Sequence, residues 1–151
     1  MNHLANAVAI ASKAHLTHKP DKGGSAYILH PLRMMMRMDT DEERMVAVLH
    51  DVVEDHRHEG YTFESLAGEG IPECVLAALR CVTKTDDEER RGDAAYDDFI
   101  RRAATNAIAR RVKLADLEDN MNIMRLEAIT PRDVVRLEKY HRSWKYLKSI
   151  G

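Results

Sequence analysis

Hydrophobic and polar residues follow one another along this chain with the period of α-helices. Apolar residues recur at three- and four-residue steps, the pattern of a helix with one buried face. No segment shows the two-residue alternation of a half-buried strand. The pattern predicts an all-α fold of about seven or eight helices. The length of 151 residues fits one domain, residues 1–151, with a sizeable core.

Start and stop signals predict where these helices lie. Residues 40–43 and 130–133 each begin with Thr and carry an acidic residue three positions later, the form of an N-terminal cap. We expect helices over residues 4–16, 40–55, 63–67, 96–104, 107–120 and 131–148. Two further helices are expected to begin at residues 31 and 72. In the helix that begins at Pro31, Leu32, Met35, Met36 and Met38 are expected to face the core. Residues 83–92 are expected to form a charged loop, a candidate lid over a cleft.

The central predicted helix carries an unusual polar corner. The side chains of His50 and Asp51 leave a helix about 100° apart. Glu54 follows His50 by four positions, and Asp55 follows Asp51 by four, so each pair lies on one side of the helix. Valine and leucine surround these four residues, which a solvated helix face would not show. Three partly buried carboxylates would repel one another and lose hydration, whereas a bound cation removes both costs. Imidazole with carboxylate suits Mn²⁺, Fe²⁺ or Zn²⁺.

Other polar residues stand at positions expected to be buried. His30 begins a helix between Leu29 and Leu32, and Asp116 lies between Ala115 and Leu117. Either could be a hydrogen-bonded core residue, but the polar corner needs further ligands. Asp116 has no obvious local partner, so a distant one is expected. By contrast, His15 is interpreted as a hydrogen-bonded core or boundary residue, and His56 and His58 as surface residues.

Composition narrows the class of protein. Hydrophobic residues make up 44% and charged residues 32%, which is typical of a globular chain. The net charge of −2 argues against general nucleic-acid binding. No apolar run approaches the ~20 residues of a membrane span, and the N-terminus lacks a signal-peptide pattern, so we expect a cytoplasmic protein. Cys74 and Cys81 are expected to be buried, reduced thiols.

Three motifs occur in the order found in HD-domain metal-dependent phosphohydrolases. They are G-x-x-Y-x-x-H-P at 24–31, H-D-x-x-E-D at 50–55 and V-K-L-A-D-x-x-x-N at 112–120. Within that superfamily the chain resembles most closely the (p)ppGpp hydrolase domain of RelA/SpoT-type proteins and its small stand-alone relatives. The resemblance implies a single HD-domain helical bundle that removes the 3′-pyrophosphate of a guanosine alarmone. From the length of 151 residues we expect no synthetase domain of the long bifunctional enzymes.

The resemblance also implies roles for individual residues. His30, His50, Asp51 and Asp116 correspond to the ligands of one divalent ion, with Mn²⁺ preferred and Fe²⁺, Zn²⁺ or Co²⁺ as alternatives. Glu54 and Asp55 correspond to the carboxylates that handle the attacking water and the leaving group. The resemblance makes Lys19, Asn120, Arg136 and Tyr140 candidate substrate contacts. Lys22 and Lys84 are added as candidates from their loop positions, beside paired glycines and in the candidate lid. Lys19 stands where the family often has an arginine over the guanine, and a lysine stacks less well on a base.

Two alternatives stay open. One is an HD-type nucleotidase or phosphomonoesterase that acts on another nucleotide, and the other is a non-catalytic nucleotide-binding helical domain. In each case the partner is a small nucleotide, with no nucleic acid and no membrane, and self-association into a homo-oligomer is left open. The pairing of Glu54 with Asp55, together with Asn120, favours the alarmone.

Overall fold

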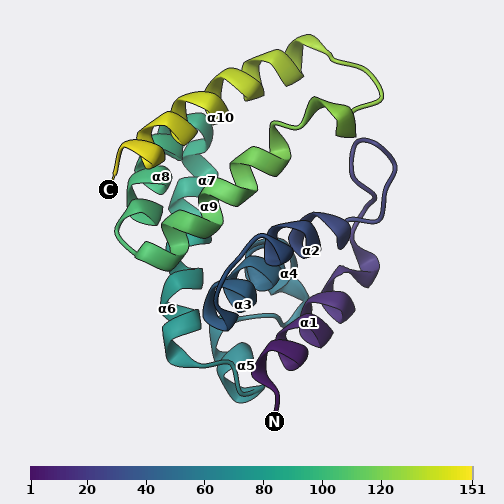
Figure 1. Ribbon diagram of the computed structural model, residues 1–151, viewed down its shortest axis with the longest axis vertical. Coiled ribbons are helices and arrows are strands. Elements are labelled where there is room, and N and C mark those ends of the chain that lie inside the picture. The colour runs from purple at the N-terminus through teal and green to yellow at the C-terminus, as the bar shows by residue number, and fades with distance from the viewer. Residues whose placement is uncertain (151) are drawn as a thin grey trace.

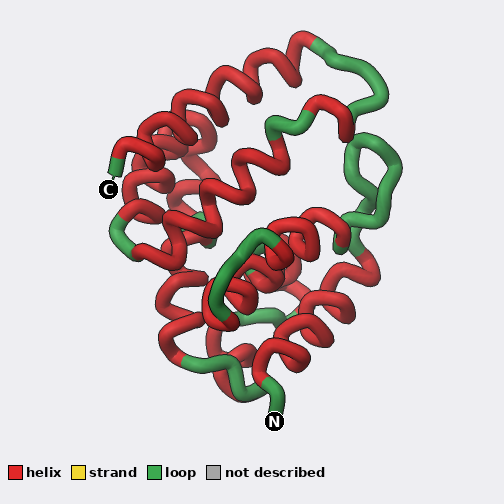
Figure 2. The backbone as a smooth tube through the Cα atoms, in the orientation of Figure 1, coloured by secondary structure: helices red, strands yellow, loops and turns green. Residues whose placement is uncertain are grey.

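The computed structural model describes residues 1–150, which consist of helices and the loops that join them (Figure 2). Seven helices have eight residues or more: α1 (His3–Ala14), α2 (Leu29–Met36), α3 (Asp41–Leu49), α6 (Glu73–Val82), α8 (Tyr96–Ala104), α9 (Ala107–Asn120) and α10 (Pro131–Ser149). Three are shorter: α4 (Val52–His56), α5 (Phe63–Gly68) and α7 (Asp86–Arg91). Single 3₁₀ turns are η1 (His15–Thr17), η2 (Arg57–Glu59), η3 (Gly92–Ala95) and η4 (Ile123–Arg125). Residues 1–150 include no strand, so the all-α prediction is confirmed.

Helix α3 is the centre around which the other helices pack. It starts at the predicted capping box, where Thr40 Oγ1 accepts from Glu43 N at 3.2 Å and Glu43 Oε2 accepts from Thr40 N at 3.2 Å. Its residues 46–49 are fully buried, because α1, α2, α6 and α9 all pack against it (Figure 1). Burial of each such Val or Leu side chain contributes about 1.5–3 kcal/mol. The buried second half of α3 therefore holds the polar corner in a fixed place.

The predicted continuous helix over 40–55 is interrupted. Helix α3 ends at Leu49, and α4 begins only at Val52. The His50 ring lies 2.8 Å from the carbonyl oxygen of Ala47, the acceptor that residue 51 would use in an unbroken α-helix. This side-chain bond competes with the helical one, so the chain turns at His50 and Asp51. The turn places the His-Asp pair at a helix junction rather than on a straight helix face.

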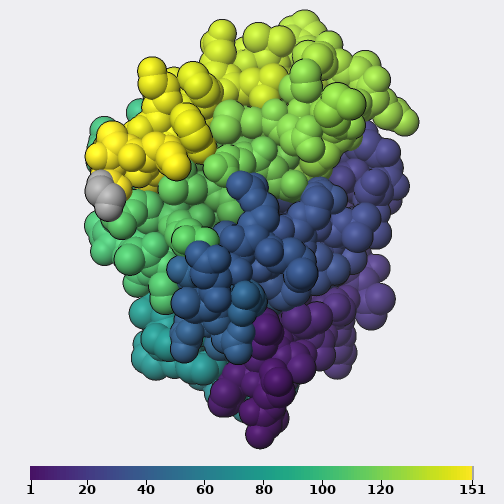
Figure 3. All heavy atoms as spheres, in the orientation of Figure 1, coloured from purple at the N-terminus to yellow at the C-terminus, as the bar shows by residue number. Residues whose placement is uncertain are grey.

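Helix α10 covers the far end of the molecule and forms a second, smaller core. Phe99 and Ile100 of α8 and Leu117 of α9 pack with Leu147 of α10. Thr130 and Asp133 form the predicted capping box of α10. In Figures 1 and 3 the yellow α10 lies at one end of the long axis, and the purple α1 lies at the other. The candidate site lies between the α2–α4 group and the α9–α10 pair.

Three predictions about local structure are wrong. The expected loop 83–92 contains α7, whose capping box joins Thr85 to Glu88. Cys74 is exposed and Cys81 is only half-buried, so neither is a core thiol. Met36 is 77% exposed, contrary to expectation, and Met34 is fully buried in its stead, whereas Leu32, Met35 and Met38 pack in the core as expected. Among the helices of residues 1–150, none has the length and apolarity needed to cross a bilayer.

Candidate active site

Four predicted ligands converge from three helical segments. His30 comes from the first turn of α2, His50 and Asp51 from the α3–α4 junction, and Asp116 from α9. His30, His50 and Asp51 each offer a ligand atom within 4.8 Å of the other two. Asp116 Oδ1 adds to this group, since it lies 3.0 Å from His30 Nε2 and 3.5 Å from His50 Nε2. Asp116 is 6% exposed and faces the cluster rather than solvent.

The Nδ1 atoms of His30 and His50 are hydrogen-bonded to other groups of the protein. These bonds leave the Nε2 atom of each ring to face the site. His50 Nδ1 must donate to the Ala47 carbonyl, because a carbonyl oxygen only accepts. His30 Nδ1 donates to Asp119 Oδ2 at 2.5 Å. Asp119 is in turn held by Arg33, whose Nε and Nη2 lie 2.9 and 3.0 Å from its two oxygens. Such outer partners are typical of histidines that bind metals.

The inner atoms of the cluster suit a divalent cation. In the neutral tautomers just described, His30 Nε2 and His50 Nε2 present lone pairs toward the Asp51 and Asp116 carboxylates. His50 Nε2 is buried and has no hydrogen-bond partner among residues 1–150. Burial lowers the pKa of His50, but Asp51 and Asp116 outweigh it and raise that pKa overall. The raised pKa shows that the two carboxylates favour a positive charge between them and the imidazoles. A divalent metal ion bound by the two imidazoles and two carboxylates would supply that charge.

Glu54 and Asp55 line the same cavity, of about 240 Å³, as the four ligand candidates. Burial, followed by repulsion from Asp51, raises the pKa of Glu54, although the backbone amide of Lys84 donates to its Oε1 at 2.9 Å. Burial and the charges of Asp51 and Glu54 raise the pKa of Asp55 to about 7. A carboxyl group with a pKa near neutrality can exchange a proton during turnover.

Asp55 should make the stability of the chelated, metal-free protein depend on pH. Its pKa is about 7 in the folded chain against an ordinary value of 3.8, so the folded state holds the proton more tightly. Its contribution to stability is therefore complete below pH 3.8 and is lost as the pH rises through 7. The shift corresponds to at most about 4 kcal/mol, and partial exposure of Asp55 reduces this amount.

Urea unfolding at pH 5 and pH 8 in the presence of a chelator measures this loss. The Asp55→Asn variant should lose less stability between the two pH values than the parent chain. An equal loss in both proteins would show that other groups produce the pH dependence.

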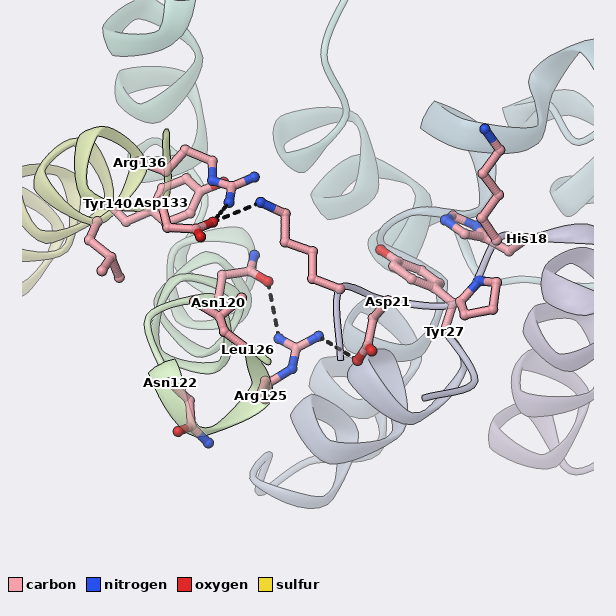
Figure 4. A pocket seen from close by; sticks show the side chains of 14 residues that line it. His18, Asp21, Tyr27, Asn120, Asn122, Arg125, Leu126, Asp133, Arg136 and Tyr140 are labelled. Atoms are coloured by element: carbon pink, nitrogen blue, oxygen red, sulfur yellow. Dashed lines mark hydrogen bonds and ion pairs between the residues drawn. The ribbon is translucent and has the colours of Figure 1, made fainter. Parts of the chain in front are cut away.

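A second cavity, of about 270 Å³, adjoins the first and shares Tyr27, Asn120 and Tyr140 with it. Figure 4 shows His18 and Tyr27 on one side of this outer cavity and Arg136 and Tyr140 on the opposite side. The His18 and Tyr27 rings are stacked in parallel, with their centroids 3.6 Å apart. The outer cavity therefore combines flat aromatic surfaces with cationic side chains, next to the metal-ligand candidates.

The predicted substrate contacts all line one of these two cavities. Lys19, Lys22 and Arg136 line the outer cavity, Lys84 lines the inner one, and Asn120 and Tyr140 line both. Two of the cations are already paired, because Lys22 Nζ lies 2.9 Å from Asp133 Oδ1 and Arg136 donates to the same oxygen. The Asn120 amide donates to Asp116 Oδ1 at 2.9 Å, so it also orients a ligand candidate.

Several residues at the site had no predicted role. Lys113 Nζ lies 2.7 Å from Asp116 Oδ2, so Asp116 does have a local partner, contrary to expectation. Tyr27 donates its hydroxyl proton to Asp51, and Arg125 joins Asp119 to Asp21. Tyr27, Lys113 and Asp119 lie within the sequence motifs at 24–31 and 112–120, and this position was the only indication in the sequence of a role at the site. The partners of Tyr27 and Asp119 are 24 and 89 positions away, and only the fold reveals them, whereas Lys113 and Asp116 are three positions apart on one helix.

Replacing Asp119 with asparagine should weaken metal binding without removing a ligand. The amide keeps the shape of the side chain but holds the His30 Nδ1–H less strongly, and loss of such a partner typically costs about 10- to 100-fold in metal affinity. Titration against a chelating dye measures the change. Glu118→Gln is the control, because Glu118 is adjacent in sequence but its side chain pairs with Arg37 at the surface. Equal affinities for Asp119→Asn and the control would contradict the orienting role.

One of the two histidines interpreted as surface residues is buried. His58 has a side chain that is 72% exposed, as expected. His56 is only 4% exposed, because α4 extends through it and turns its ring inward against His15 and His18. His15 is buried, as expected, but its Nδ1 contacts other imidazoles rather than backbone or carboxylate groups.

Comparison with known proteins identifies the fold. No protein-family model and no curated protein sequence matches the chain. Among solved structures, one described as a metazoan ortholog of SpoT that hydrolyses ppGpp and plays a role in starvation responses matches with a TM-score of 0.79. The two chains are 20% identical, and the match covers 100% of this chain and 88% of the other. The chain therefore shares the all-helical fold of that structure, the fold that the resemblance of the motifs predicted.

Proposed function

We propose that this chain is a metal-dependent pyrophosphohydrolase that removes the 3′-pyrophosphate of ppGpp. The observation that carries the proposal is the convergence of His30, His50, Asp51 and Asp116 beside two carboxyl groups with raised pKa values. The likeness in fold to a structure described as a ppGpp hydrolase supports the substrate. The adjoining cavity, with its aromatic and cationic lining, supports a nucleotide of some kind.

The four ligand residues would hold one divalent ion. We infer Mn²⁺ as that ion, because mixed imidazole and carboxylate ligands suit it, with Fe²⁺, Zn²⁺ or Co²⁺ as alternatives. When bound, such an ion lowers the pKa of water and offsets negative charge on a phosphoryl group. Lys113 balances part of the charge on Asp116, so that this carboxylate stays ionised in a buried place.

Glu54 and Asp55 would move the protons of the reaction. Water attacks the phosphorus atom next to O3′, the P–O3′ bond breaks, and GDP and pyrophosphate are the products. One carboxylate accepts the proton of the attacking water, and the other carboxyl group gives a proton to the departing O3′. Asp55, with a pKa of about 7, can hold or release a proton near neutral pH. The Lys84 amide keeps Glu54 oriented in the cavity.

The outer cavity would bind the guanosine and its phosphates. Tyr140 offers an aromatic face, and the half-buried His18 and Tyr27 form the opposite wall. Lys22 and Arg136 meet on Asp133, so both cations are positioned across the cavity and could turn to a second anion. Lys19 takes the place of the arginine expected over the base, and we propose that its charge rather than stacking contributes there.

A product screen separates this proposal from its alternatives. The full chain, loaded with Mn²⁺, is incubated with ppGpp, pppGpp and nucleoside monophosphates, and pyrophosphate and orthophosphate are measured separately. We expect pyrophosphate from the two alarmones and no orthophosphate from the monophosphates. Orthophosphate from monophosphates would instead identify a phosphomonoesterase. Metal binding with no turnover of any nucleotide would favour a binding domain. Cytoplasmic location stays a prediction, and self-association stays open.

A further inference from the structure

A second group of histidines lies beside the candidate active site. His15 belongs to η1, His18 to the loop that follows it, and His56 to the end of α4. His15 Nδ1 is 3.2 Å from His18 Nδ1 and 3.2 Å from His56 Nε2, and His18 Nδ1 is 3.0 Å from His56 Nε2. The three ring nitrogens thus form a nearly equilateral triangle. His15 and His56 are buried, and His18 is half-buried.

Hydrogen bonds cannot satisfy this triangle. A ring nitrogen of a neutral imidazole presents either a hydrogen or a lone pair. Among three nitrogens that all touch one another, at least two must present the same, and that contact is repulsive. Adding protons to the rings only places like charges together. The other nitrogen of His15, Nε2, is buried and has no partner among residues 1–150. Hydrogen bonding within the protein therefore does not explain why these rings meet.

A cation bound by all three lone pairs removes the conflict. Two imidazole nitrogens bound to one tetrahedral Zn²⁺ at 2.0–2.1 Å lie about 3.3 Å apart, which is close to the separations seen here. We propose that His15, His18 and His56 form a second divalent transition-metal site, distinct from the candidate active site. Three imidazoles select Zn²⁺, Co²⁺, Ni²⁺ or Cu²⁺ rather than Mg²⁺ or Ca²⁺. A water or another external ligand completes the tetrahedron.

The surroundings of the cluster orient its rings as ligands. His56 Nδ1 faces Glu59 Oε1 at 3.3 Å, which leaves Nε2 free to point into the cluster. Glu59 is itself held by Thr17 Oγ1 at 3.2 Å. This is the carboxylate–histidine arrangement found behind metal ligands. The stack against Tyr27, with planes only 4° apart, fixes the orientation of the His18 ring.

The second ion would tie two parts of the active cleft together. His15 and His18 begin the segment that runs along the outer cavity, whereas His56 ends the helix that carries Glu54 and Asp55. Tyr27 stacks on His18 and donates its hydroxyl proton to Asp51. The ion is therefore a structural clamp that holds one wall of the outer cavity against α4. It is not an additional catalytic centre.

Metal stoichiometry tests the proposal. The full-length chain is stripped with a chelator, reloaded with Zn²⁺, freed of excess metal by gel filtration and analysed for zinc per chain. We expect two ions in the parent chain, one in His18→Gln, one in Asp51→Ala and none in the double variant. His18 is half-buried at the surface, so its replacement should leave the fold intact, and circular dichroism checks this. The exposed neighbour His58 provides the control His58→Ala, which should keep two ions.

A second readout isolates the histidine cluster from the candidate active site. In the Asp51→Ala background, added Co²⁺ should give the strong visible absorption of a tetrahedral site, and His18→Gln should abolish it. Failure of the proposed function would alter activity but not this spectrum. The proposal is overturned if His18→Gln retains as much metal as the parent chain. An equal loss of metal in His18→Gln and His58→Ala would likewise overturn it, since that pattern indicates non-specific binding by surface histidines.

Discussion

Asp51→Ala is expected to lose the catalytic metal and to lower turnover by roughly 10³-fold or more, because water activation and charge neutralisation each contribute several kcal/mol. Asp51 is a predicted ligand that lies 3.0 Å from His50 Nε2 and accepts from Tyr27. Turnover is measured at saturating Mn²⁺, and Mn²⁺ content is measured on the same preparation. Circular dichroism verifies that the helices persist.

The control for this variant is His58→Ala, seven positions past Asp51. Its side chain is 72% exposed and lines neither cavity of the cleft. Metal content and turnover should match those of the parent chain. Equal losses in Asp51→Ala and His58→Ala would show that the metal lies elsewhere.

Glu54→Gln and Asp55→Asn are expected to retain the Mn²⁺ and to lower turnover by about 10²- to 10⁴-fold, the usual contribution of general acid–base catalysis. Both residues line the inner cavity but stand outside the set of atoms that converge as ligands. The replacements keep the shape of each side chain while removing its exchangeable proton. Single-turnover rates and metal content are compared in each variant, with Mn²⁺ in excess.

The two measurements separate a proton-transfer role from a ligand role. Metal lost in proportion to activity would make Glu54 or Asp55 a ligand. Unchanged turnover on ppGpp would remove them from the reaction. The pKa of Asp55, about 7, further predicts that the pH profile of turnover changes in Asp55→Asn.

Most of the fold could be predicted because its signals are local. The capping boxes at Thr40 and Thr130 mark helix starts within four residues of sequence, and both form as expected. Helix α7 was missed, although Thr85 and Glu88 have the same spacing, because six of six residues in it are charged and none marks an apolar face. In the short helix α2, three consecutive methionines offer no contrast from which to judge the inward face, hence the error at Met36.

The candidate site was predictable where motifs specify residues and unpredictable where partners are distant. His30, His50, Asp51 and Asp116 meet as expected. The break at His50 and Asp51 accompanies a side-chain bond from His50 to the Ala47 carbonyl, which competes with the backbone bond of the helix. His56 lies in a polar stretch and looks like a surface residue, yet contacts with His15, 41 positions earlier, bury it. No local pattern carries that information.

Hydrolysis of ppGpp in ¹⁸O-labelled water tests the central claim most directly. The Mn²⁺-loaded chain is incubated with ppGpp, the reaction is stopped with a chelator, and the products are separated and analysed by mass spectrometry. We expect GDP and pyrophosphate in equal amounts, with one ¹⁸O atom in the pyrophosphate, because water attacks phosphorus rather than the sugar carbon. The account would be contradicted by ppGpp that remains intact in the presence of fully metal-loaded protein, or by orthophosphate as the product.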